Sequence, residues 1–387
     1  MTAGHDVAED GPVGPAASRA IVDADARFVD RAGPRALGEA AAAPVGRAPP
    51  RSPNRRAWDR FTRNRLGLWS LWLFGGLLLL SACAELLSND RPLLASYEGE
   101  LFMPIVSNPP ETRFGGDFLT PTEWSDPFIV QQFAKPGNWM LRAPNHHSAN
   151  STEYFAKGAF PAAPDANHWL GTDQVGRDMV ARLLYGFRVS ILFAFALTAI
   201  GLVLGLAAGA VQGYFGGRLD LTMQRLIEIW TSIPELYLLI IFASIFEPSL
   251  LLLLILLSAW GWLGLSDYVR AEFLRNRSLE FVKAARALGL SNAQIIWRHV
   301  LPNSMTPVIT FLPFRMSGAI IALTSLDFLG LGVPASTPSL GDLLRQGKNN
   351  LDSWWIIFPT FVLLVVTMLL LTFIGDALRD AFDTRKS

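Results

Sequence analysis

The stretch SLEFVKAARALGLSNAQIIWRHVLPN, residues 278–303, lies between two long apolar runs and yet carries several ionisable side chains. Four of its apolar residues fall at positions i, i+3, i+4 and i+7 of a helix: Phe281, Ala284, Ala285 and Leu288. This spacing places them on one face, and the two alanines keep the middle of that face small. The pattern predicts an amphipathic helix, held at a membrane surface, that another surface can approach closely.

The ends of this helix can also be predicted from local residues. Ser278 is expected to cap its first turn, and Glu280 suits the positive end of the helix dipole. Gly289 is expected to end it. The run Ser291–Gln294 fits a capping box that starts a second helix, which Pro302 should limit. We therefore expect two short helices joined at a glycine.

Composition indicates a membrane protein. Of the 387 residues, 51% are hydrophobic and 17% are charged, with a formal net charge of zero, and the charges avoid several windows of about twenty residues. The neutral balance, without a basic stripe, gives no support to nucleic-acid binding. The single cysteine, Cys83, lies in an apolar run, which excludes a disulfide framework or a cysteine metal site within the chain.

The apolar windows predict an all-α polytopic membrane protein with six transmembrane helices. Their approximate bounds are 66–87, 189–212, 221–246, 250–265, 305–326 and 354–374. Arginines are concentrated at 51–65, before the first window, and basic residues recur at 270–298 and at the carboxyl end. The positive-inside rule then predicts that both termini and the bent stretch lie on the cytoplasmic side of the membrane.

Five segments follow from these windows. They are a disordered cytoplasmic tail (1–50), a basic lead-in with the first span (51–87), an extracytoplasmic insert (88–187), a core with the cytoplasmic loop 270–303 (188–376) and a cytoplasmic tail (377–387). The insert is expected to be irregular with some β structure. It contains His146 and His147, but no third and fourth ligand follows at usable spacing, so we expect no metal site.

Two spans carry unusual residues. The second has glycines at intervals of four from Gly201 to Gly213, and helix packing inside one chain is favoured over a pore-lining role. In the third, Arg225 and Glu228 are spaced to pair, while Pro234 and Glu235 interrupt the middle. A charge at this depth should face other helices or water. Two alternatives remain open for Glu235: it lines a translocation path, or it is a hydrogen-bond partner beside a proline kink.

The sequence contains no motif for nucleotide hydrolysis. The glycine-rich run 341–349 has five residues between its glycines instead of four, and an asparagine where the magnesium-binding hydroxyl residue belongs. Neither HExxH nor GxSxG occurs. We expect no enzyme activity and no cofactor, so any process driven by nucleotide hydrolysis would need another protein to supply the energy.

The opening stretch resembles the EAA loop of ATP-binding-cassette (ABC) importer permeases. Glu280 begins the motif, Ala284 and Ala285 follow, Gly289 takes the glycine position and Leu301–Pro302 closes it. The spacing after Glu280 is looser than the consensus, and a charged residue precedes the alanines. The resemblance implies a coupling helix that docks on the ATPase through Glu280, Lys283, Ala284, Ala285, Leu288, Gly289, Leu301 and Pro302.

Further motifs resemble the dipeptide and oligopeptide permeases. They are LGTD and GRD within 170–178, GYFGGRLD at 213–220, TSLDFLGLG at 324–332, PSLGDLL at 338–344 and GDALRDAFD at 375–383. Three finer stretches, at 54–72, 114–118 and 270–281, resemble the Yej-type permeases, which serve an importer that admits the peptide antibiotic microcin C.

The resemblance implies a five-helix importer-permease core of the binding-protein-dependent type, with an N-terminal helix and a large insert added. Its implied partners are a second, unlike permease, one or more ABC ATPase subunits, an extracytoplasmic solute-binding protein, a peptide substrate and membrane lipid. Two rival functions keep the same architecture. One is an importer for dipeptides, nickel or glutathione; the other is a channel that works without an ATPase.

Overall fold

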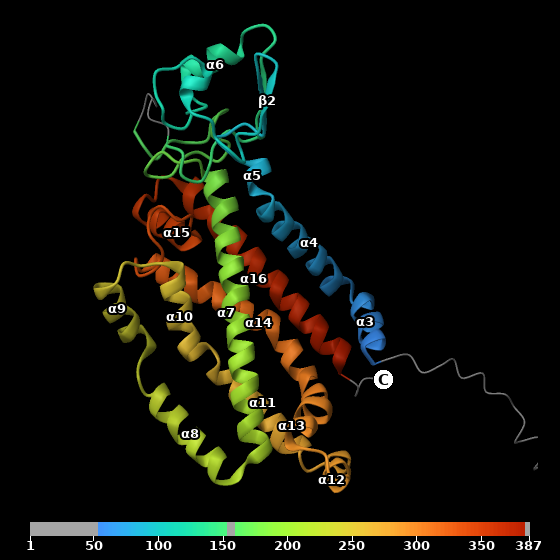
Figure 1. The fold of residues 1–387 in the computed structure, drawn as a ribbon. Helices are drawn as coiled ribbons and strands as arrows, with labels where there is room; N and C mark the ends of the chain where they lie inside the picture. Colours follow the sequence, from blue (N-terminus) through green and yellow to red (C-terminus); the bar gives the residue numbers. More distant parts are fainter. Residues whose placement is uncertain (1–52, 153–158, 384–387) are drawn as a thin grey trace, which may run out of the picture. The chain divides into compact units, whose positions relative to one another are not determined.

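The computed structural model describes residues 53–152 and 159–383 (Figure 1). The predicted disordered tail, 1–50, lies outside these described residues. Contacts divide the chain into Met1–Pro53 and Asn54–Ser387, and the arrangement below is that of the second unit. It opens with α3 (Pro53–Arg63) and α5 (Ala84–Leu87) on either side of the first span.

Within the described residues, five helical stretches are long and apolar enough to cross a membrane. They are α4 (Arg65–Ala82), α7 (Met179–Phe215), α10 with α11 (Leu250–Gly261 and Leu263–Asn276), the stretch Asn292–Phe328 that ends in α14 (Leu301–Phe328), and α16 (Trp354–Phe382). A sixth crossing is formed if α8 (Gly217–Thr231) and α9 (Glu235–Ile245), which are bent by 60°, count as one broken span. Five of the six predicted windows are thus found as spans, and the sixth, 221–246, is found as this bent pair, with the break where Pro234 and Glu235 predicted an interruption.

Several spans are longer than the sequence predicted, the second and fourth most clearly. Residues 179–187, which the sequence assigned to the insert, form one helix with the second span: α7, of 37 residues. At ~1.5 Å per residue it is about 55 Å long, well beyond a hydrocarbon core of ~30 Å. The fourth span continues to Asn276 instead of ending near residue 265. Polar side chains in these extensions lower the mean hydropathy, so a hydropathy window ends before the helix does.

The glycines of α7 pack against α10 and α11 within the same chain. This is the role that their spacing favoured over lining a pore. Each is buried. A Cβ atom added to Gly209 would lie 2.5 Å from the Ser266 carbonyl oxygen, and one added to Gly213 would lie 2.5 Å from the Phe273 Cβ. No side chain fits at either position, so the backbones of the two spans are in direct contact.

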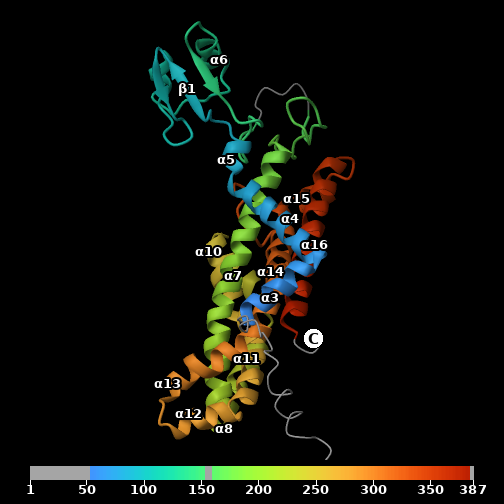
Figure 2. The same ribbon diagram turned by 90° about the vertical axis from the view of Figure 1, so that its right-hand side faces the viewer.

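The remaining spans pack around α7. An apolar cluster that includes Leu197, Ile320 and Leu371 joins α7, α14 and α16. Helix α4 lies along α16, where a Cβ atom on Gly67 would meet the Cβ of Ala377 (Figures 1 and 2). The glycine-rich run 341–349 is helical within α15 (Leu340–Asn349) and does not form a phosphate-binding loop.

The insert before α7 contains the predicted β structure. Strands β1 (Leu94–Tyr97), β2 (Glu100–Phe102) and β3 (Trp139–Leu141) form an antiparallel sheet in the order β2-β1-β3. Phe114, at the end of a 3-10 turn (Glu111–Phe114), packs edge-on against Trp124 and Phe133, the last residue of α6 (Pro127–Phe133). The insert and the bent stretch 278–303 lie at opposite ends of the helix bundle (Figures 1 and 2).

Candidate functional site

Residues 278–303, which we call the bent segment, fold as two short helices around Gly289. Helix α12 (Glu280–Ala287) is followed by α13 (Asn292–Ile295), a π-helical turn (Ile296–Val300) and α14. Gly289 has φ +79°, which disfavours any residue with a Cβ, while a Cβ there would meet no atom within 4 Å. The glycine is therefore required by backbone conformation and not by a close neighbour.

The hydrogen bonds at the bend match the predicted motifs. The Gly289 amide donates to the Arg286 carbonyl (3.0 Å) and the Leu290 amide donates to the Ala285 carbonyl (3.2 Å), which is the Schellman pattern of a helix end. The capping box is confirmed, because the Ser291 amide donates to Oε1 of Gln294 (3.0 Å) and the Gln294 amide donates to the Ser291 hydroxyl.

Two details of the prediction are wrong. Ser278 does not cap α12, because Leu279 occupies the N-cap and the Ser278 hydroxyl donates to the Arg275 carbonyl (2.8 Å) at the end of α11. Pro302 does not end the second helix. It lies in the first turn of α14, where its missing N–H is tolerated, and the chain stays helical through the π-helical turn before it. Leu301 and Pro302 therefore lie beyond α13, on the helix that enters the bundle.

Helix α12 has an inner and an outer apolar face. Val282 and Ala285 are buried, and they belong to the cluster that contains Phe273 and Ile295. The four residues predicted to share one face are thus divided, because Ala285 is buried while the other three are exposed. Phe281, Ala284 and Leu288 form an outer face that is exposed, with Leu288 80% accessible.

Charged groups border the outer face. Lys283 and Glu280 form an exposed ion pair of 2.8 Å along the helix. Arg286 lies over the ring of Tyr214, and the Tyr214 hydroxyl donates to Oδ1 of Asn292 (2.9 Å). The last turn of α7 is thereby joined to both short helices. The structure brings the residues from Glu280 to Gly289 together in one short helix and its end, mounted on the bundle by its inner side.

Glu235 begins α9, directly after the break in the third span. It borders a cavity of about 300 Å³ that is also lined by Thr198, Trp260 and Arg315. Among the described residues Glu235 has no hydrogen-bond or ion-pair partner, which favours the path-lining alternative over an interhelical hydrogen bond. Arg225 and Glu228 of α8 form the predicted pair, at 2.5 Å.

Sequence reasoning missed Arg315, which lies within α14 and lines the same cavity. Its guanidinium donates to the Gly261 carbonyl at the end of α10. The signal was present, because a charge inside an apolar window is expensive and marks a functional position. The argument applied to Glu235 in the third span applies equally to Arg315 in the fifth.

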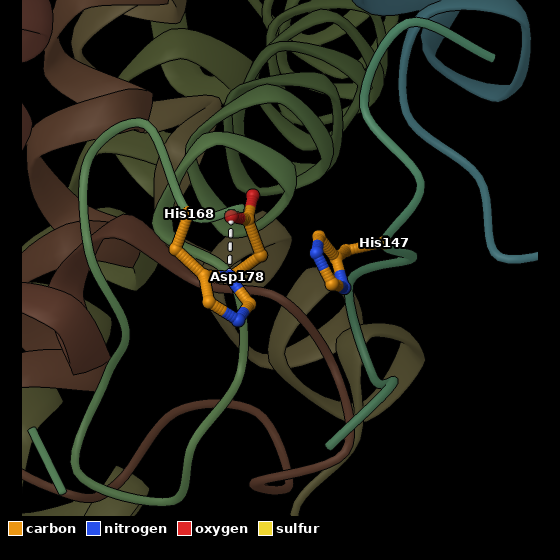
Figure 3. Close-up of side chains that lie close together, drawn as sticks. All are labelled: His147, His168 and Asp178. Carbon is orange, nitrogen blue, oxygen red and sulfur yellow. Dashed lines mark hydrogen bonds and ion pairs between the residues drawn. The ribbon is translucent and has the colours of Figure 1, made fainter. Parts of the chain in front are cut away.

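A polar cluster anchors the start of α7. One possible ligand atom from each of His147, His168 and Asp178 lies within 4.8 Å of the others (Figure 3). Sequence spacing did not indicate that His168 and Asp178 lie beside His147. His146 is not part of this group. Both Asp178 oxygens already accept hydrogen bonds: Oδ1 from Asn145 (2.7 Å) and the Ala181 amide (2.8 Å), and Oδ2 from His168 Nδ1 (3.0 Å).

These bonds explain the arrangement without an ion. Burial is the largest single influence on Asp178 and acts to raise its pKa, but the hydrogen bonds from His168, Ala181 and Asn145 together lower the pKa below its ordinary value. Asp178 is therefore an ionised N-cap of α7, and the cluster fixes the insert to the bundle.

A bundle of apolar spans, a polar cavity at a broken span and an amphipathic bent segment at one end together define a membrane transport subunit. Residues 183–387 match the family described as binding-protein-dependent transport system inner membrane component. Residues 52–110 match the N-terminal transmembrane domain of oligopeptide transport permease C.

Curated relatives agree with these matches. The inner membrane ABC transporter permease protein YejE of Escherichia coli K12 is 46% identical over 334 residues, covering 86% of this chain and 98% of the relative. The peptidoglycan transport system permease protein YejE of Agrobacterium fabrum is 45% identical over 357 residues, covering 86% and 93%. The oligopeptide transport system permease protein OppC of Haemophilus influenzae is 37% identical over 228 residues, covering 58% and 73%.

The chain belongs to the family of binding-protein-dependent inner membrane permeases, and within it to the Yej-type peptide ABC permeases. The predicted class is confirmed: a multi-pass inner membrane component of a peptide importer that is not itself an enzyme. Membership of this family implies an ATPase and a solute-binding protein as partners.

Proposed function

We propose that the bent segment receives the movement of the partner ATPase and passes it to the spans. The observation that carries this proposal is the exposed outer face of α12, Phe281, Ala284 and Leu288, on a helix whose inner face is buried. Exposed apolar residues at adjacent helical positions mark an interaction surface. The small Ala284 at its centre lets a groove on the partner approach closely.

The connections of α12 suggest how the movement is transmitted. From α13 the chain is helical through to Phe328, so a shift of α13 is carried directly into α14. Gly289 allows α12 to change its angle to α13 without breaking either helix. Closure of the ATPase would move α12 with its groove and tilt α14, which supplies Arg315 to the polar cavity. Alternating access of the cavity follows from this tilt.

The orientation of the chain is part of this proposal. Six cationic residues lie in or near the bent segment: Arg270, Arg275, Arg277, Lys283, Arg286 and Arg298. By the positive-inside rule this end of the bundle faces the cytoplasm, and six crossings then place both termini there. The insert is at the opposite end, where a solute-binding protein would dock.

We further propose a second, unlike permease as the partner within the membrane, as the resemblance to the dipeptide and oligopeptide permeases implies. For cargo, the matches support peptides. Microcin C-like peptides remain a proposal. The name of the Agrobacterium fabrum relative favours a second class, peptides derived from peptidoglycan.

The coupling proposal is tested by Leu288→Asp, with Leu351→Asp as the matched control. Leu288 is 80% exposed and Leu351, between α15 and α16, is 78% exposed, so neither change should affect folding. We expect Leu288→Asp to abolish copurification of the ATPase and peptide uptake, because a charge replaces an apolar side chain of the proposed contact. Leu351→Asp should retain the ATPase. Normal ATPase retention by Leu288→Asp, at normal membrane levels, would contradict the proposal.

A further inference from the structure

The cavity beside the broken span has charged groups of opposite sign. Glu235 lines it from the first turn of α9, and Arg315 from α14. The two do not form an ion pair with each other, and Arg315 is instead held by the Gly261 carbonyl. A membrane-embedded cavity that keeps an acid and a base apart is suited to a ligand that carries both charges.

Buried donors around the cavity have no acceptor. Among the described residues, buried polar atoms without a hydrogen-bond partner include Nε of Arg315, Nε1 of Trp260 and the hydroxyl of Thr198, and all three residues line this cavity. Thr198 is itself 7% exposed. Buried donors in folded proteins are normally paired, so this group indicates a missing acceptor.

The cavity walls are kept free of side chains. Gly264 and Gly318 both line it, and a Cβ atom at either position would have no atom within 4 Å. Packing within this chain therefore does not require glycine there. Any larger residue would instead occupy the cavity. At about 300 Å³ the cavity is at the lower end of the range for ligand sites, which suits a short length of extended chain.

We propose that this cavity is a subsite for the main chain of the transported peptide. Arg315, Trp260 and Thr198 donate hydrogen bonds to its terminal carboxylate, and Glu235 accepts from its amino terminus. A zwitterionic peptide main chain has both groups, whatever its side chains are. The inference rests on the proposed function, because the coupled cycle must deliver the peptide to the cavity.

The test uses the reconstituted importer with its ATPase and binding protein, and three substrates: an alanine tripeptide, its C-terminal amide and its N-acetyl form. We expect Arg315→Gln to raise the KM for the free tripeptide by roughly tenfold, the loss expected for one hydrogen bond to a charged group, and to affect the amide much less. Glu235→Gln should affect the free peptide and spare the N-acetyl form. The contribution of the binding protein to KM cancels, because each variant is compared with the parent for the same peptide and the same binding protein.

Three more variants, one of them a control, protect the test against misfolding. Gly318→Leu should fill the cavity and block uptake of all three peptides, without removing a charge. Thr198→Val should weaken uptake a few-fold, whereas Thr360→Val should not, because Thr360 is also buried but donates to the Ile356 carbonyl in α16. The parent importer and Thr360→Val should both show ATP hydrolysis stimulated by the binding protein, which verifies coupling separately from the subsite. Equal effects of Arg315→Gln on all three peptides, or unimpaired uptake with Gly318→Leu, would overturn the subsite.

Discussion

The two ends of α7 differ in how their polar groups are used. At its start, Asp178 is fully buried, and its two oxygens accept hydrogen bonds from a side chain of the insert, a histidine and a helix amide. At its other end, Tyr214 holds α13 by one hydrogen bond, and the outer face of α12 is exposed. At the first end, both Asp178 oxygens are paired within the chain. At the second, we propose that a partner covers the exposed face.

This difference separates an anchor from a moving part. A saturated buried network resists movement, because breaking any member leaves another group unpaired. A short helix mounted by two buried side chains, Val282 and Ala285, can change its angle at lower cost. The insert end should therefore govern stability, and the bent segment should govern transport.

The largest expected effect is at the anchor. Asp178→Ala removes the N-cap and leaves buried Asn145 and His168 groups without their acceptor, so we expect a loss of about 3 kcal/mol in the free energy of unfolding. The matched control is Asp126→Ala, which removes an exposed N-cap of α6 and should cost about 1 kcal/mol. Thermal denaturation of the purified chain in detergent measures both. Similar losses for the two variants would show that burial of the Asp178 network contributes little.

A smaller effect is expected at Gly289, where a substitution should change the rate of transport and not the stability. Alanine at φ +79° is strained by roughly 1–2 kcal/mol, so Gly289→Ala should reduce peptide uptake about tenfold while insertion and thermal stability stay near normal. Gly289→Asn should be milder, because asparagine adopts this conformation more readily. Gly289→Pro should abolish uptake. If Gly289→Ala unfolded the bundle as Asp178→Ala does, the distinction between the two ends would be lost.

The smallest effect is the acid dependence of the anchor. The pKa of Asp178 is lowered in the folded chain, so its charge stabilises the fold above the ordinary aspartate pKa of about 4. That contribution should be lost as the pH falls through the lower, folded-state pKa. The stability difference between the parent and Asp178→Asn should thus shrink as the pH falls below 4. A difference that grows below pH 4 would reverse the assigned sign.

Local sequence was sufficient to predict much of the bent segment. The positive-φ glycine and the capping box at Ser291 involve residues within five positions of one another, and such motifs are set by local backbone hydrogen bonds. The break at Pro234 follows from the same kind of local rule. The two faces of α12 were not predictable, because which side is buried depends on Phe273 and Ile295 from other elements.

Contacts between residues far apart in the sequence could not be predicted. His147 and Asp178 are 31 positions apart in the sequence, and no spacing rule brings His147 and His168 to Asp178. Arg315 could have been found as a charge in an apolar window. That Arg315 shares a cavity with Glu235 could not be predicted, because this requires knowing which sides of α9 and α14 face the cavity.

The central claim is that the outer face of α12 meets the ATPase on the cytoplasmic side. The direct measurement is labelling of Leu288→Cys by a membrane-impermeant maleimide, with the single native cysteine replaced as Cys83→Ala. We predict labelling in inverted membrane vesicles stripped of the ATPase, protection when the ATPase is restored, and no labelling of intact cells. Labelling of intact cells, or equal labelling with and without the ATPase, would contradict the claim.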